Sequence, residues 1–239
     1  MKLTVFTAAV LLLIVPIASA ENIGSFFGTF TTGESMTKGQ IRLSGGVGVA
    51  DATSVGGMLA YSFSDDVDGR IKLGLVDDAL FETGIAVGTD FKWQVMRKTE
   101  PTAYTATNDP GAAPSQRKNS PFDLAVGGFM EWTNMDYGGD LVVESQTVWQ
   151  VGAQVIASYP IMLKNGTELS PYGRFNLRHE SFSIDLMPGM PDGYDISDSK
   201  LAFGLNAGVA WSVTDVIVLY GELQFDGNDG IFLAIDFGI

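Results

Sequence analysis

The 239-residue sequence contains no cysteine and only one histidine. The lack of cysteine excludes disulfides and thiolate metal sites, so stability must come from hydrogen bonding and packing. Beyond residue 20 no apolar run approaches the roughly 20 residues of a membrane-spanning helix, although 46% of the residues are hydrophobic. Positive charge is also scarce, with 14 Lys and Arg against 28 Asp and Glu. This acidic balance argues against nucleic acid as a partner.

The first 20 residues have the pattern of a cleaved signal peptide. A basic start at Lys2 is followed by an apolar run, Leu3–Ile14, and by the small residues Ala18–Ala20. We therefore expect cleavage after Ala20. No cysteine follows that could carry a lipid anchor. Residues 21–39 are rich in Gly, Ser and Thr and are interpreted as a flexible N-terminal lead-in or as an extra strand.

The last ten residues alternate strictly in polarity. Every second side chain is apolar (Ile231, Leu233, Ile235, Phe237, Ile239), and the other face carries Phe232, Ala234, Asp236 and Gly238. The same alternation predicts ten strands, at 40–49, 55–63, 70–76, 84–96, 121–132, 147–159, 169–178, 200–213, 216–225 and 230–239.

One face of these strands carries nearly all the long apolar side chains, and the other is rich in Gly, Ala, Gln, Asn and charge. A secreted β-sandwich or lipocalin-like barrel would instead place its Trp and Phe residues inside. The pattern therefore favours one all-β domain over residues 40–239, an antiparallel up-and-down transmembrane β-barrel of about ten strands, with 8–12 as the range.

The signal peptide, the alternation and the terminal strand together resemble bacterial outer-membrane β-barrels of the OmpA/OmpX/porin-like superfamily. The terminal strand departs from the family pattern because its aromatic residue, Phe237, precedes the last residue by two. The resemblance implies an outer-membrane location, contact with lipid, insertion by the barrel-assembly machinery and no cofactor.

The connections between strands divide by charge. With both termini in the periplasm, the outer set (50–54, 77–83, 133–146, 179–199, 226–229) contains acids and no Lys or Arg, whereas the periplasmic set contains Arg97, Lys98, Arg117, Lys118 and Lys164. The long Pro-rich loop 97–121 falls in the periplasmic set, where turns of such barrels are short. It is therefore either an insertion there or a sign of a missed strand.

Two groups of side chains are expected to mark the two faces of the wall. The lumen-lining charges are Arg42, Arg70, Lys72, Asp90, Lys92, Asp123, Glu131, Arg174, Arg178, Glu222 and Asp236. The aromatics at the membrane interfaces are Tyr61, Phe63, Trp93, Trp132, Trp149, Tyr159 and Trp211. The near balance of inward charge favours a salt-bridged polar core, and the alternative is a constricted water path with acidic vestibules.

The sequence thus predicts a small outer-membrane barrel that is structural or forms a narrow, porin-like passage for ions or small solutes. The alternative is a surface binding or adhesion module acting through the acidic loops 133–146 and 179–199.

Hydrolases are remote alternatives. His179 and Ser181 are similar to the His-x-Ser arrangement of lipid A deacylases, and an omptin-like protease would combine His179 with Asp192, Asp195 or Asp198. These three Asp residues could also hold Ca²⁺, but a solvated acidic loop is favoured, and no metal site is expected.

Overall fold

A computed structural model describes residues 23–78, 83–98, 119–136, 143–186 and 196–239. The predicted signal peptide lies outside this part of the chain. Ten long strands form the wall: β1 (Ile41–Val49), β2 (Ala52–Ser64), β3 (Val67–Asp78), β4 (Gly84–Lys98), β6 (Asp123–Asp136), β7 (Val143–Ser158), β9 (Glu168–Leu186), β10 (Ile196–Ser212), β11 (Ile217–Phe225) and β12 (Gly230–Gly238). Two further strands, β5 (Asn119–Ser120) and β8 (Ile161–Met162), have two residues each.

The sheet closes on itself. Each long strand pairs antiparallel with the long strand before it and the one after it, and β1 pairs with both β2 and β12. At the closure Val47 lies opposite Val55 on one side and Leu233 on the other. Closure removes the exposed strand edges that would otherwise leave backbone groups unpaired. The predicted all-β, up-and-down barrel with ten strands is confirmed.

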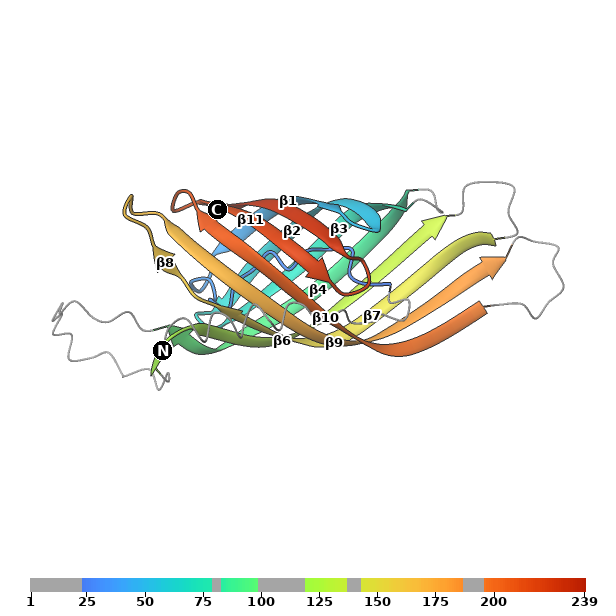
Figure 1. Cartoon of the computed structure of the whole chain (residues 1–239), viewed down its shortest axis with the longest axis horizontal. Helices are drawn as coiled ribbons and strands as arrows, with labels where there is room; N and C mark the ends of the chain where they lie inside the picture. Colours follow the sequence, from blue (N-terminus) through green and yellow to red (C-terminus); the bar gives the residue numbers. More distant parts are fainter. Residues whose placement is uncertain (1–22, 79–82, 99–118, 137–142, 187–195) are drawn as a thin grey trace, which may run out of the picture.

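The barrel has two unequal ends (Figure 1). We call the end that holds the C-terminus and the turn 65–66 the near end, and the end that holds the turns 50–51 and 226–229 the far end. Strands β7, β9 and β10, with 16, 19 and 17 residues, are longer than the nine-residue β1, β11 and β12. The wall therefore extends further on one side at the far end.

Strand β9 continues to Leu186, eight residues beyond the predicted end at Arg178, and β10 begins at Ile196 instead of Lys200. Because β4 and β6 pair antiparallel with each other, β4 ends and β6 begins at the near end, the side predicted for the 97–121 connection. Only its ends are described, where β5 pairs parallel with β4.

The outer face of the wall carries the apolar side chains. In the middle of β3, Ile71 is 63% exposed and Leu73 is 61% exposed. Six of the seven predicted interface aromatics are exposed on this face: Tyr61, Phe63, Trp93, Trp149, Tyr159 and Trp211. The seventh, Trp132, is half-buried because it packs on Trp149, with ring centroids 6.3 Å apart. Such a belt of exposed apolar and aromatic side chains matches a surface that faces lipid.

The inside of the barrel contains residues 23–39, a position that the alternating pattern of the sequence does not predict. Residues 23–39 form neither an extra strand nor a lead-in outside the barrel: they run through the lumen from the far half to the near end, where β1 begins. Phe26, Phe27 and Phe30 are buried inside the wall. The described residues contain no helix long and apolar enough to cross a membrane.

Candidate functional site: the occupied lumen

The eleven charged residues predicted to line the lumen all lie on the inner face of the wall. Arg42 is partly exposed at the near end, and the others are buried: Arg70, Lys72, Asp90, Lys92, Asp123, Glu131, Arg174, Arg178, Glu222 and Asp236. Buried charges need partners, because desolvation makes an unpaired ion costly. The strand register determines which partners are within reach.

One ion-pair network spans β3, β4 and β6. Arg70 lies directly opposite Asp90 in the β3–β4 ladder and binds it with two hydrogen bonds, Nε to Oδ1 at 2.7 Å and Nη2 to Oδ2 at 2.8 Å. Lys72, on the same face two residues later, reaches Asp90 Oδ2 and Glu131 Oε1, each at 3.1 Å. Lys72 is 1% exposed, so it joins two carboxylates away from solvent. The network ties three neighbouring strands together.

A second network lies in the far half. Arg178 binds Glu180 Oε1 through Nε at 2.7 Å, and its Nη1 is 3.6 Å from Asp226 Oδ2. Glu180 and Asp226 are not among the predicted lumen-lining residues, because they fall in the predicted connections 179–199 and 226–229. Their inward position follows from the extra length of β9 and from the fold of the β11–β12 turn.

Two further ion pairs lie toward the near end. Lys92 Nζ is 3.2 Å from Asp68 Oδ2, and Arg42 Nη1 is 3.1 Å from Asp236 Oδ2. Asp68 was predicted to belong to a turn, but it lies on the inner face of β3, opposite Lys92. Together with Glu180 and Asp226, Asp68 turns the near balance of inward charge into an acidic excess.

The excess carboxylates hold the backbone of the luminal segment. Three side chains of the wall accept hydrogen bonds from four backbone N–H groups: Ile23 to Glu180 Oε2 at 3.3 Å, Gly24 to Glu180 Oε1 at 3.2 Å, Ser25 to Asp226 Oδ2 at 3.3 Å and Thr29 to Glu222 Oε1 at 2.8 Å. A charge-assisted bond of this kind is stronger than one between neutral groups. The luminal segment has no regular secondary structure and therefore no strand partner for its backbone. Side chains of the wall supply the hydrogen-bond partners that a neighbouring strand would otherwise provide.

The carbonyl groups of the same segment accept hydrogen bonds from the wall. Gln224 Nε2 donates to Ser25 O at 2.6 Å, Gln150 donates to Gly24 O, and Arg70 Nη1 donates to Thr29 O. Inward amides and an inward cation thus both bind the carbonyl groups of the segment.

Three phenylalanines anchor the segment by burial. Phe26 and Phe27 pack in a cluster with Ala52, Val76, Ala86 and Met135. Phe30 packs in a second cluster with Met58, Tyr172, Tyr220 and Phe232. Gly74 leaves room for Phe27, since a Cβ at this position would lie 3.0 Å from its ring. The segment fills the lumen where the wall carries small residues.

The turn between β11 and β12 contains a carboxyl with a shifted pKa. Burial raises the pKa of Asp226 to about 6, against the opposing effect of the Arg178 and Arg174 charges and of the hydrogen bonds from Ser25 and Asn228.

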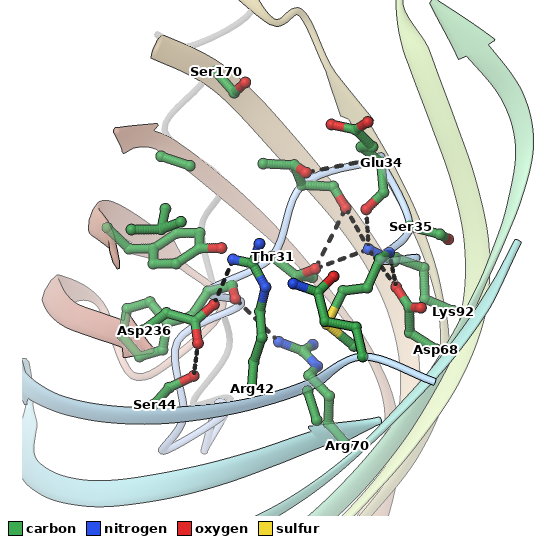
Figure 2. A pocket seen from close by; sticks show the side chains of 18 of the residues that line it. Thr31, Glu34, Ser35, Arg42, Ser44, Asp68, Arg70, Lys92, Ser170 and Asp236 are labelled. Carbon is green, nitrogen blue, oxygen red and sulfur yellow. Dashed lines mark hydrogen bonds and ion pairs between the residues drawn. The ribbon is translucent and has the colours of Figure 1, made fainter. Parts of the chain in front are cut away.

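Beyond the luminal segment toward the near end lies a cavity of about 220 Å³ (Figure 2). Phe30 and Thr31 form part of its lining, Tyr220 and Arg42 line it from the wall, and Glu34 lies at its mouth. On the far side of this cavity, the buried side chains of Phe26 and Phe27 pack against the inner face of the wall.

Arg174 differs from the other inward cations because two of its nitrogen atoms have no hydrogen-bond acceptor among the described residues. It is 1% exposed and lies 4.8 Å from the centroid of the Phe129 ring. Its Nε and Nη1 atoms contact no acceptor among the described residues. The cation–π contact with Phe129 is its visible compensation.

The residues of the hydrolase alternative lie on the outer face. His179 is exposed, and the residues directly opposite it in the two neighbouring strands are Val151 and Leu201. Ser181 shares its face, opposite Trp149 and Ser199. No carboxylate lies directly across from His179 in these pairings, so the register brings no third member of a catalytic triad to the pair.

The acidic loop of the metal and protease alternatives is only partly visible. Asp192 and Asp195 lie outside the described residues, and Asp198 is exposed in β10. Within the described ranges no three His, Asp or Glu side chains converge closely enough to hold a metal ion.

Comparisons with known proteins add likeness of fold only. No protein-family model matches the chain, and no curated protein matches its sequence. Among solved structures, the N-terminal β-barrel domain of Pseudomonas aeruginosa OprF is similar at 12% identity and a TM-score of 0.37, over 85% of this chain and 100% of that one. The NanC porin is similar at 8% identity and a TM-score of 0.31, over 82% and 97%. Strand pairing and the exposed apolar belt, and not these distant likenesses, make this chain a small β-barrel of the outer-membrane type.

Proposed function

We propose that the protein is an outer-membrane barrel with a narrow, porin-like lumen that its own N-terminal segment closes. The observation that carries the proposal is the seating of residues 23–36 inside the closed wall, with backbone groups bound by inward carboxylates and amides. The apolar belt supports lipid contact along the outer face. The barrel-assembly machinery would then insert the chain and would meet a terminal strand, β12, whose aromatic Phe237 precedes the last residue by two.

Size limits what such a lumen passes. Barrels of about eight strands have room for side chains only, and open aqueous channels are typical of about 16–18 strands. A ten-stranded barrel freed of its luminal segment would have a narrow path lined by the paired ions of the wall. Its acidic excess would favour small cations. While the segment is seated, the path is closed.

Single-channel recording tests this directly. Folded protein in planar bilayers should show little or no conductance, and a variant lacking residues 23–36 should show discrete, cation-selective steps. A deleted barrel that is folded, as judged by heat-dependent mobility on gels, and is still electrically silent would overturn the proposal.

A cysteine reporter tests the same point without a deletion, because the native chain has no cysteine. Ser25 is 1% exposed in the closed lumen, and Thr37 is exposed at the near end. The cysteine of the Ser25→Cys variant should resist a charged thiol reagent, whereas that of Thr37→Cys should react at once. Reaction of both at the same rate would mean that the segment does not close the lumen.

Surface binding is the second candidate, supported by the extension of β7, β9 and β10 at the far end. Asp185 and Asp198 are exposed on this extension. Shortening the β6–β7 and β9–β10 connections should then abolish binding of a partner and leave any conductance unchanged.

A further inference from the structure

The cavity at the near end is lined by charges of both signs that are unequally paired (Figure 2). Its three cations each contact a carboxylate: Arg42 with Asp236, Arg70 with Asp90 and Lys92 with Asp68. These pairs neutralise the positive charge of the lining. Arg70 and Lys92 are buried and held against the wall by these pairs, whereas Arg42 is partly exposed and binds Asp236 through Nη1 only.

Two further carboxylates line the cavity, those of Glu34 and Glu168. Neither is within ion-pair distance of a cation among the described residues, and Glu168 Oε1 accepts only the hydroxyl of Ser170, at 2.8 Å. Partial withdrawal from water, together with the negative charges of Asp123 and Glu168, raises the pKa of Glu34 against the opposing effect of the Arg97 and Lys92 charges. The mouth of the cavity thus carries two carboxylates that have no direct ion-pair partner among the described residues.

Deeper in the cavity two other features suit a cation. Asp68 is 4% exposed and lines the cavity, and its Oδ1 receives no hydrogen bond from the described residues. The rings of Phe30 and Tyr220 also line it, with centroids 6.1 Å apart. Aromatic faces attract organic ammonium groups in the same way as they attract Lys and Arg.

We infer that this cavity binds a small organic cation with one or two amino groups, with Glu34 and Glu168 as counter-ions at the mouth and Phe30 and Tyr220 beside the carbon chain. The volume of about 220 Å³ corresponds to about seven water molecules at roughly 30 Å³ each, which is enough for a short diamine. A metal ion fits less well, because no three carboxylates converge there among the described residues.

Binding of putrescine to the folded protein in detergent, measured by calorimetry, tests this inference without any need for conductance. The wild-type protein should bind putrescine, and butane-1,4-diol, which has the same chain without charge, should not bind. The Glu34→Gln/Glu168→Gln variant should bind putrescine at least tenfold more weakly. A Tyr220→Leu variant should also weaken binding, because it removes one of the two rings.

The control is Asp215→Asn, which removes an exposed carboxylate at the same end of the barrel but outside the cavity. This variant should retain wild-type affinity. Absence of putrescine binding, equal binding of the diol, or an equal loss in Asp215→Asn would each overturn the inference. The last result would indicate general attraction of cations by an acidic protein.

Discussion

Glu222 in β11 accepts a hydrogen bond at 2.8 Å from the backbone N–H of Thr29, a residue 193 positions earlier in the chain. The same carboxylate accepts bonds from Asn206 at 2.7 Å and from the hydroxyl of Tyr172 at 2.7 Å. All three donors approach a group that is 2% exposed. The luminal segment is therefore bound to the wall as specifically as one strand is bound to the next.

The first prediction concerns this contact. Glu222→Gln keeps the shape but replaces one acceptor oxygen with a donor, so Thr29 or Tyr172 loses its partner. Loss of a hydrogen bond to a buried charged group should cost about 1.5–3 kcal/mol. Hydrogen exchange of residues 26–30 should become faster while the strand amides stay protected.

Asp215→Asn, an exposed change in the β10–β11 turn, serves as the control and should leave exchange of the segment unchanged. If Glu222→Gln loosens the whole wall to the same extent as the segment, the carboxylate stabilises the barrel and does not hold the segment in particular.

The second prediction concerns the Lys72 network. Lys72→Met should destabilise the folded barrel by about 3–5 kcal/mol, because it leaves Glu131 buried without a cation. Asp90 keeps Arg70. Urea unfolding followed by tryptophan fluorescence measures the change. The double variant Lys72→Met/Glu131→Gln should be less destabilised than the single variant, since the unpaired charge is gone; an equal or greater loss would contradict this explanation.

The third prediction follows from the pKa of Asp226, which burial raises from 3.8 to about 6. A raised carboxyl pKa means that folding favours the protonated form. The contribution of this group to stability is therefore complete below about pH 4 and is lost as the pH rises through about 6.

Comparison of the wild-type protein with Asp226→Asn isolates this effect, since all other groups titrate in both proteins. The wild-type advantage in unfolding free energy over the variant should be larger at pH 4 than at pH 7. A difference that does not change with pH, or one that grows toward pH 7, would contradict the shifted pKa.

The alternation of side chains predicts the strands of the wall and their two faces well, because successive side chains of a β-strand in a closed barrel point either into the lumen or outward. Arg70 and Asp90 could be assigned inward from their parity alone. The same reasoning fails at strand ends: the alternation predicts a strand that stops at Arg178 and a loop at Glu180, whereas β9 continues to Leu186. Residue propensity does not show where β9 ends, because β9 continues together with β7 and β10 beyond the ends of the shorter strands on the other side of the barrel.

The luminal segment could not be read from periodicity, because residues 23–39 have no repeating pattern and are held by contacts from distant strands. Ser25 illustrates this, since its partners Glu131, Gln224 and Asp226 come from two parts of the chain more than 100 residues away from it, β6 and the end of β11. The one local signal was the presence of Phe26, Phe27 and Phe30 in a segment otherwise rich in Gly, Ser and Thr. Three aromatics in a segment without an apolar face indicate burial by another part of the chain.

The last prediction tests the membrane placement itself. Leu73 lies in the middle of β3 and is 61% exposed on the outer face. In a lipid bilayer, Leu73→Arg would place a charge at the midplane of the hydrocarbon and should cost about 2–4 kcal/mol, whereas the same change near the interface should cost about 0–1 kcal/mol. Val216, 52% exposed beside the β10–β11 turn, provides the matched control as Val216→Arg.

Unfolding of both variants in lipid vesicles, followed by tryptophan fluorescence in urea, measures the difference. A water-soluble barrel would tolerate both substitutions equally, because an exposed arginine costs little in water. Equal stability of the two variants would therefore contradict the membrane placement, and a selective loss in Leu73→Arg would place the middle of β3 within the hydrocarbon.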